Sequence, residues 1–116
     1  MNSPERILVV DDEKATVRLI REELGRLGHH VTCAYDGREA LAILKEEDFD
    51  RVIVDVMMPY IDGFQVIKWI RAHPTKKSTW IALMTPQADS LDEFNREWLG
   101  ADHYVPKPFA ANDLLP

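Results

Sequence analysis

Five short, mostly apolar stretches along the chain have the length of buried β-strands. They are Ile7–Val10, His30–Ala34, Val52–Asp55, Trp80–Met84 and His103–Val105. Between them, apolar side chains recur every three or four residues, which is typical of amphipathic helices. Helices are expected over residues 14–27, 37–44, 64–71, 90–99 and 112–115. This alternation predicts an α/β fold in which a doubly wound five-stranded parallel sheet is covered by helices on both faces.

Capping and stop residues support the helix boundaries. Asp62 is placed to cap the helix that begins near Phe64. Glycines follow two of the predicted helices and are expected to end them: Gly28 and Gly100. Reciprocal capping boxes are expected at two further helix starts: Asp36 with Glu39, and Ser90 with Glu93.

Charged and hydroxyl side chains follow the predicted strands. Asp11 and Asp12 come after the first stretch and Asp55 ends the central one. Thr85 follows the fourth stretch, and Lys107 follows the fifth. A single Asp after a strand usually caps a turn or a helix, so each residue alone says little. In a parallel sheet, however, the carboxyl ends of all strands share one edge, and these five side chains are expected to gather there.

Three carboxylates at one edge of a sheet need a cation. At an effective dielectric constant near 20, each pair of charges repels by about 3 kcal/mol at such distances. Oxygen ligands without a neighbouring His or Cys favour Mg²⁺. Lys107 adds a positive charge and Thr85 adds a hydroxyl donor. Together these groups supply the nucleophile and the charge neutralisation that phosphoryl transfer requires.

Length, charge and cysteine content limit the classes of function. The 116 residues are enough for one domain. A net charge of -6 disfavours direct binding of nucleic acid by this domain. Cys33 is the only cysteine, which precludes an internal disulfide and suits a reducing compartment. The first apolar stretch is too short for a signal peptide or a membrane span, so a cytoplasmic protein without membrane contact is expected.

Several other polar residues are assigned to the surface. The acidic residues 46–48 are expected at a solvated helix end. The four histidines lack the spacing of metal ligands. Four cationic side chains are expected on solvated faces: Arg38, Lys45, Lys76 and Lys77.

Four motifs in the right order resemble those of the receiver domain of two-component response regulators. The motifs are Val9-Val10-Asp11-Asp12-Glu13, Val54 to Pro59 with Asp62-Gly63, Met84-Thr85, and Gly100 to Phe109. Each motif alone is weak, but the set covers the whole chain. The resemblance implies a flavodoxin-like receiver fold with strand order 2-1-3-4-5 and a cis peptide between Lys107 and Pro108.

The resemblance also implies a function and a set of roles. The domain would be a signalling switch that accepts a phosphoryl group on Asp55 from a histidine kinase or a histidine phosphotransfer protein. It would then act on an output domain or a downstream protein, and it would be no enzyme beyond slow self-dephosphorylation. Lys107 would contact the phosphoryl group, and Thr85 with Tyr104 would form the switch pair. Mg²⁺ would be held by four residues: Asp11, Asp12, Asp55 and the backbone carbonyl of Met57.

Two departures from the family pattern leave alternatives open. Pro86 follows the switch hydroxyl, and proline lacks the N–H that would donate to a phosphoryl oxygen. A receiver-like module that only binds partners is therefore one alternative. An aspartyl-phosphate phosphohydrolase is a weaker one, because Met57 stands where that chemistry would need a second carboxylate. The last helix has barely begun when the chain ends at Pro116, so a fragment of a longer regulator is expected.

Overall fold

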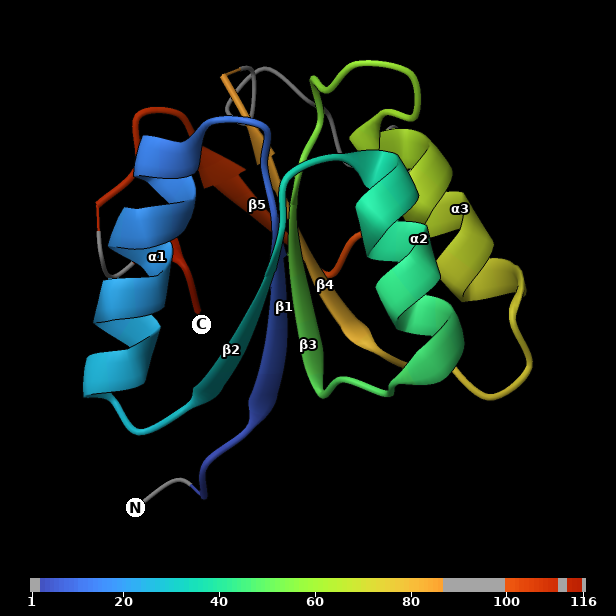
Figure 1. The fold of residues 1–116 in the computed structure, drawn as a ribbon, viewed down its shortest axis with the longest axis horizontal. Helices are drawn as coiled ribbons and strands as arrows, with labels where there is room; N and C mark the ends of the chain where they lie inside the picture. The colour runs from blue at the N-terminus through green and yellow to red at the C-terminus, as the bar shows by residue number, and fades with distance from the viewer. Residues whose placement is uncertain (1–2, 87–99, 111–112, 116) are drawn as a thin grey trace.

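The computed structural model describes residues 3–86, 100–110 and 113–115 (Figure 1). Its elements are β1 (Arg6–Val10), α1 (Lys14–Arg26), β2 (His30–Ala34), α2 (Gly37–Glu46), β3 (Arg51–Asp55), α3 (Gly63–Ala72), β4 (Trp80–Thr85) and β5 (His103–Pro106). The predicted helix over 90–99, with its capping box at Ser90, lies outside the described residues, as does the start of the one over 112–115. Within the described ranges, no helix has the length and apolar character needed to cross a membrane.

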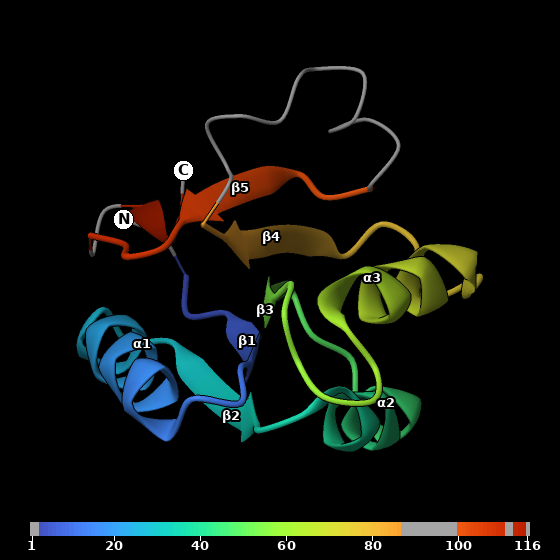
Figure 2. The ribbon, with the colours of Figure 1, turned by 90° about the horizontal axis from the view of Figure 1, so that it is seen from above.

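All five strands form one parallel sheet in the order β2-β1-β3-β4-β5, which confirms the predicted fold class and strand order. Helix α1 covers one face of this sheet, whereas α2 and α3 lie side by side on the other (Figures 1 and 2). Short parallel strands with helices on both faces bury their side chains in both directions. The inner strands β1, β3 and β4 are therefore apolar at most of their positions.

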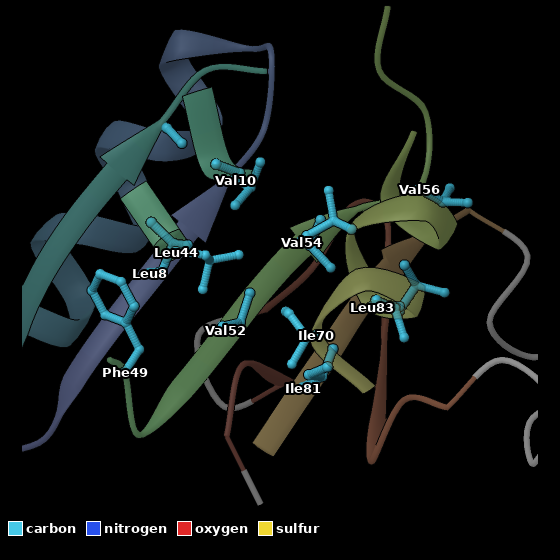
Figure 3. Close-up of a cluster of buried hydrophobic side chains, with 14 residues drawn as sticks. Leu8, Val10, Leu44, Phe49, Val52, Val54, Val56, Ile70, Ile81 and Leu83 are labelled. Carbon is cyan, nitrogen blue, oxygen red and sulfur yellow. The ribbon is translucent and has the colours of Figure 1, made fainter. Parts of the chain in front are cut away.

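Alternate residues of each strand enter two separate hydrophobic clusters. Val52 and Val54 of β3 pack in the cluster beneath α2 and α3, beside Leu83 of β4 (Figure 3). Ile53 points the other way and packs in the cluster beneath α1 together with Val9. Successive side chains of a strand thus point to opposite faces of the sheet. This alternation decides which side chains at the strand ends face α1 and which face α2 and α3.

The helix starts follow the predicted caps, with one difference. Asp62 forms a full capping box with Gln65, since each side chain accepts from the other residue's backbone N–H. At α2, Asp36 accepts from the Glu39 N–H at 2.7 Å as predicted. The Glu39 carboxylate, however, accepts from the N–H of Tyr35 at 3.5 Å and not from that of Asp36, so only half of this box forms.

Lys76 was expected on a solvated face, and this was wrong. Its side chain is only 8% exposed, and Nζ lies 2.6 Å from Asp48 Oδ1 and 2.9 Å from the Glu47 carbonyl oxygen. The hydrogen bond and the positive charge of Lys76 lower the pKa of Asp48. Lys76 thus links the connection after α3 to the connection after α2, at the amino-terminal ends of the strands.

Candidate functional site

Asp55 lies at the carboxyl end of β3 with only 3% of its surface exposed. It follows Ile53 by two residues and therefore faces α1. The chain then returns so that Gly63 donates its N–H to the Val56 carbonyl at 3.1 Å. A Cβ atom at position 63 would lie 2.3 Å from the Asp55 carbonyl oxygen, so only glycine fits behind this strand end.

The acidic pair after β1 lies next to Asp55. Asp11 is fully buried, and its N–H donates to the Ala34 carbonyl at 3.1 Å, which extends the pairing of β1 with β2 by one step. Its Oδ1 accepts from the Glu13 N–H at 2.9 Å and so fixes the turn into α1. Asp12 is exposed at the rim. Carboxylate oxygens of Asp11, Asp12 and Asp55 all lie within 4.8 Å of one another.

Lys107 brings a cation into this group from the chain just beyond β5. Its Nζ lies 2.9 Å from Asp11 Oδ2 and 3.1 Å from Asp55 Oδ1. A third carboxylate, Glu13 Oε1, lies 3.4 Å away. The peptide bond between Lys107 and Pro108 is cis, the geometry that the resemblance implies. The sequence analysis assigned no role to Glu13. Its position directly after Asp11 and Asp12 was the feature that could have indicated its place in the site.

Burial and repulsion change the protonation of the carboxylates. Burial, followed by the negative charge of Asp11, raises the pKa of Asp55 to about 6, and Lys107 offsets only part of this. Burial likewise raises the pKa of Asp11. For Lys107, burial alone would lower the pKa, but the neighbouring carboxylates of Asp11 and Asp55 outweigh burial and raise it. The site therefore carries excess negative charge with one ammonium to balance it.

A divalent cation suits this group of side chains. Asp11 Oδ2 is buried. Among the described residues, it lies close to the Lys107 ammonium, but this contact does not have the geometry of a hydrogen bond. A buried carboxylate oxygen with spare lone pairs, beside two further carboxylates, is a ligand set for a hard ion such as Mg²⁺. The candidate ligands Asp11, Asp12 and Asp55 are thus brought together. The side chain of Met57 is 71% exposed, and the prediction for this residue concerns only its carbonyl.

The predicted switch residues lie on β4 and β5, the next two strands of the sheet after β3. Thr85 ends β4 with 6% exposure, next to Met84, which pairs with Asp55 in the register. Tyr104 is half-buried in β5 and pairs with Leu83, two residues before Thr85. Thr85 and Tyr104 therefore lie on the same face of the sheet, the face that α2 and α3 cover. Pro86 follows on the exposed surface.

Comparisons with known proteins agree on one family. The sequence model of the response regulator receiver domain matches residues 7–116. Response regulator MprA of Mycolicibacterium vanbaalenii is 40% identical over 112 residues, which are 97% of this chain and 48% of that protein. This chain therefore spans about half the length of that curated relative.

Solved structures resemble the fold closely. The chemotaxis response regulator CheY4 of Vibrio cholerae has a TM-score of 0.89 at 32% identity, over 97% of this chain and 93% of that one. The receiver domain of the sensor histidine kinase PA1611 from Pseudomonas aeruginosa has a TM-score of 0.84 at 28% identity, over 97% and 92%. The structure of that domain holds a magnesium ion in its active site cleft.

Proposed function

Since this chain belongs to the response regulator receiver domain family, we propose that it is a phosphorylation-dependent switch of two-component signalling, with Asp55 as its phosphoacceptor. Receiver domains are in general signalling domains rather than enzymes, and slow self-dephosphorylation is the only catalysis that we propose for this one. One observation carries the proposal. The buried Asp55 carboxylate lies 3.1 Å from Lys107 and within 4.8 Å of two further carboxylates.

Asp55 has the properties of an oxygen nucleophile in this position. With a pKa of about 6, the carboxylate is mostly ionised at neutral pH even without a metal. One of its oxygens attacks the phosphorus atom of a phosphohistidine. The new O–P bond forms as the P–N bond breaks, and the electron pair leaves with the imidazole, which takes up a proton. The donor is thus a histidine kinase or a histidine phosphotransfer protein.

The neighbouring charges stabilise the group that arrives. The Lys107 ammonium already lies between Asp11 and Asp55, so it can contact a phosphoryl oxygen after a small rotation. We assign Asp11, Asp12, Asp55 and the carbonyl of Met57 as the ligands of Mg²⁺, which would neutralise charge on the phosphoryl oxygens. The magnesium ion reported in the cleft of the PA1611 receiver domain supports this assignment.

Thr85 and Tyr104 are the residues through which the phosphoryl group would change the surface. The Thr85 hydroxyl, at the end of the strand next to β3, would donate to a phosphoryl oxygen. Tyr104 would follow, because both side chains lie on the same face of neighbouring strands. Pro86 contributes no N–H, so this strand end offers one donor fewer, worth about 1.5 to 3 kcal/mol for a charge-assisted hydrogen bond. We therefore propose weak coupling between phosphorylation and the switch.

The remaining roles follow from the same proposal. The target of the switch would be an output domain or a separate downstream protein, and a domain with a net charge of -6 would not itself bind nucleic acid. A cytoplasmic location would suit phosphoryl donors of this kind.

The test is to incubate the protein with acetyl phosphate and Mg²⁺ and to measure its intact mass. We expect an adduct of one phosphoryl group that disappears with chelator and in Asp55→Asn. Asp62→Asn is the matched control, since this carboxylate caps α3 in the same connection and should leave the adduct unchanged. Absence of any adduct would favour a module that only binds partners. Rapid consumption of acetyl phosphate without accumulation of adduct would favour a phosphohydrolase.

A further inference from the structure

Two adjoining cavities form a groove on the outer side of α2 and α3. One has a volume of about 370 Å³ and the other of about 470 Å³, and both are lined by Leu41 and Ile61. Because they share these residues, the two cavities adjoin, and together they are here called the α2–α3 groove. The two helices run side by side on this face of the sheet (Figure 2). None of the residues proposed for phosphorylation lines the groove.

Each helix carries a second stripe of side chains that is separate from its core stripe. The core stripes are formed by Ala40 and Leu44 in α2 and by Val66 and Ile70 in α3. The groove is lined by other positions, which recur at helical spacing in both helices: 38, 41, 42, 45 and 46 in α2, and 65, 68, 69 and 72 in α3. A second stripe of this kind on two neighbouring helices is the surface that a third helix packs against.

The floor of the groove is apolar. Leu41 and Trp69 are half-buried, and they pack against the hydrophobic cluster beneath α2 and α3. Ile61, also half-buried, lines both cavities. Its carbonyl oxygen would lie 2.4 Å from a Cβ atom at position 37, so the connection after β3 is seated directly on the first turn of α2. The floor is therefore part of the rigid body and is preformed.

The rim of the groove is cationic, in contrast to the chain as a whole. Arg38, Lys45 and Lys68 line it and are exposed, whereas the chain has a net charge of -6. Over the part of the chain that the structure describes, no carboxylate forms an ion pair with any of these three side chains. Glu46 is the one acidic residue among the lining side chains. An acidic partner is complementary to this rim.

We propose that the α2–α3 groove docks an acidic amphipathic helix of a partner protein. Each of the two lining helices has ten residues, so the groove is about 15 Å long, which accommodates about three turns of a bound helix. Apolar side chains of the partner contact Leu41, Ile61 and Trp69, and flanking carboxylates contact the cationic rim. The apolar floor favours a protein helix over nucleic acid, whose phosphates would leave the floor uncovered.

The probe is a labelled peptide of about 14 residues with Leu at positions i, i+3, i+4 and i+7 and Glu on the flanking positions. Its binding is measured by fluorescence anisotropy with unphosphorylated protein in chelator, so that the result does not depend on Asp55 chemistry. We expect binding to the unmodified chain and about tenfold weaker binding to the double variant Lys45→Glu/Lys68→Glu, from the loss of two ion pairs and their replacement by repulsion. Leu41→Asn should weaken binding to a similar degree.

The matched control is Arg18→Glu/Arg21→Glu on α1, which changes the net charge equally on the opposite face of the sheet. It should alter the affinity less than about twofold. The proposal would be overturned if the control variant lost as much affinity as the Lys45→Glu/Lys68→Glu variant. It would also be overturned if a polyglutamate peptide without leucine bound as tightly as the probe, because the binding would then be general electrostatic attraction. Stronger binding to vesicles of anionic lipid than to the peptide would overturn it in favour of a membrane surface. Failure to bind at about 1 mM peptide would also refute it.

Discussion

Replacing Asp55 by asparagine should stabilise the metal-free fold, although it removes the proposed phosphoacceptor. The carboxylate is 3% exposed and shares its surroundings with Asp11 and Asp12, while the Lys107 ammonium lies 3.1 Å from it. Asparagine has nearly the same shape and no charge. The variant therefore removes the energetic penalty of ionising this side chain and leaves the packing in place.

The size of the effect follows from the pKa of Asp55. Its rise from 3.8 to about 6 is close to two pKa units, which corresponds to about 3 kcal/mol at 1.36 kcal/mol per unit. Burial is the largest cause of this rise, and repulsion adds to it, since two carboxylates within 4.8 Å of one another repel by about 3 kcal/mol or more at an effective dielectric constant near 20 before Lys107 offsets part of it. For a domain of this length, about 3 kcal/mol should raise the melting temperature by about 10 °C.

The pH dependence has a definite sign. Below about pH 4, Asp55 is protonated in both the folded and the unfolded chain, so it carries no penalty. Between about pH 4 and pH 6, the folded protein still holds the proton that the unfolded chain has released, and the stability of the wild type falls as the pH rises. Above about pH 6 the penalty is complete. The advantage of Asp55→Asn should therefore grow from near zero at pH 4 to its full value at pH 7.

Urea denaturation in chelator over this pH range measures the difference directly. Asp36→Asn is the control, because asparagine caps a helix as well as aspartate does and this side chain accepts the Glu39 N–H at the start of α2. Excess Mg²⁺ should narrow the difference at pH 7, since the ion stabilises the folded wild type by mass action and the variant has lost a proposed ligand. A wild type as stable as Asp55→Asn at pH 7, or an advantage that is equal at pH 4 and pH 7, would show that Asp55 is not strained by its neighbours.

Three further substitutions test other contacts. Gly63→Ala should destabilise the fold by about 2 kcal/mol or more in urea denaturation, because the new Cβ would lie 2.3 Å from the Asp55 carbonyl oxygen. An unchanged stability would show that the connection after β3 can move to accommodate the methyl group. Lys76→Met should cost about 1 kcal/mol in the same assay through the lost hydrogen bond to the Glu47 carbonyl, whereas Lys77→Met, on the exposed surface, should cost nothing measurable. Pro86→Ala restores an N–H beside Thr85. It should enlarge the NMR chemical-shift changes of β5 on addition of beryllofluoride, which mimics the phosphoryl group. Equal changes in both proteins would show that the missing donor is without consequence.

The sheet could be predicted from the sequence because its strands are buried on both faces. A stretch such as Val52 to Val54 has no polar face to present to water, so it suits the interior of a parallel sheet. The site was predictable for a related reason, since parallel strands bring their carboxyl ends to one edge. Asp11 and Asp55 could be placed side by side before any contact was known.

Contacts between distant connections could not be predicted in this way. Lys76 has the sequence context of a surface residue, and its burial depends on Asp48, which no periodicity links to it. Tyr60 adopts a φ of 66°, in the left-handed region that side chains with a Cβ disfavour. Its ring lies under the Arg38 guanidinium, with 4.3 Å from Cζ to the ring centroid, and this contact comes from α2. Local backbone preference disfavours this conformation of Tyr60, and no local sequence pattern predicts its contact with Arg38.

The register of the sheet explains why the carboxylates must repel one another. Val10 pairs with Val54, so the next residues, Asp11 and Asp55, come level at the strand ends. Both follow a residue that faces α2 and α3, and both therefore turn toward α1. The ammonium of Lys107 reaches both of them from the chain beyond β5. A shift of β3 by one residue would turn Asp55 to the opposite face of the sheet and end the repulsion. The same shift would remove Val52 and Val54 from the hydrophobic cluster beneath α2 and α3. The burial of these valines thus holds the charges together, and the stability of the core offsets the electrostatic cost of the site.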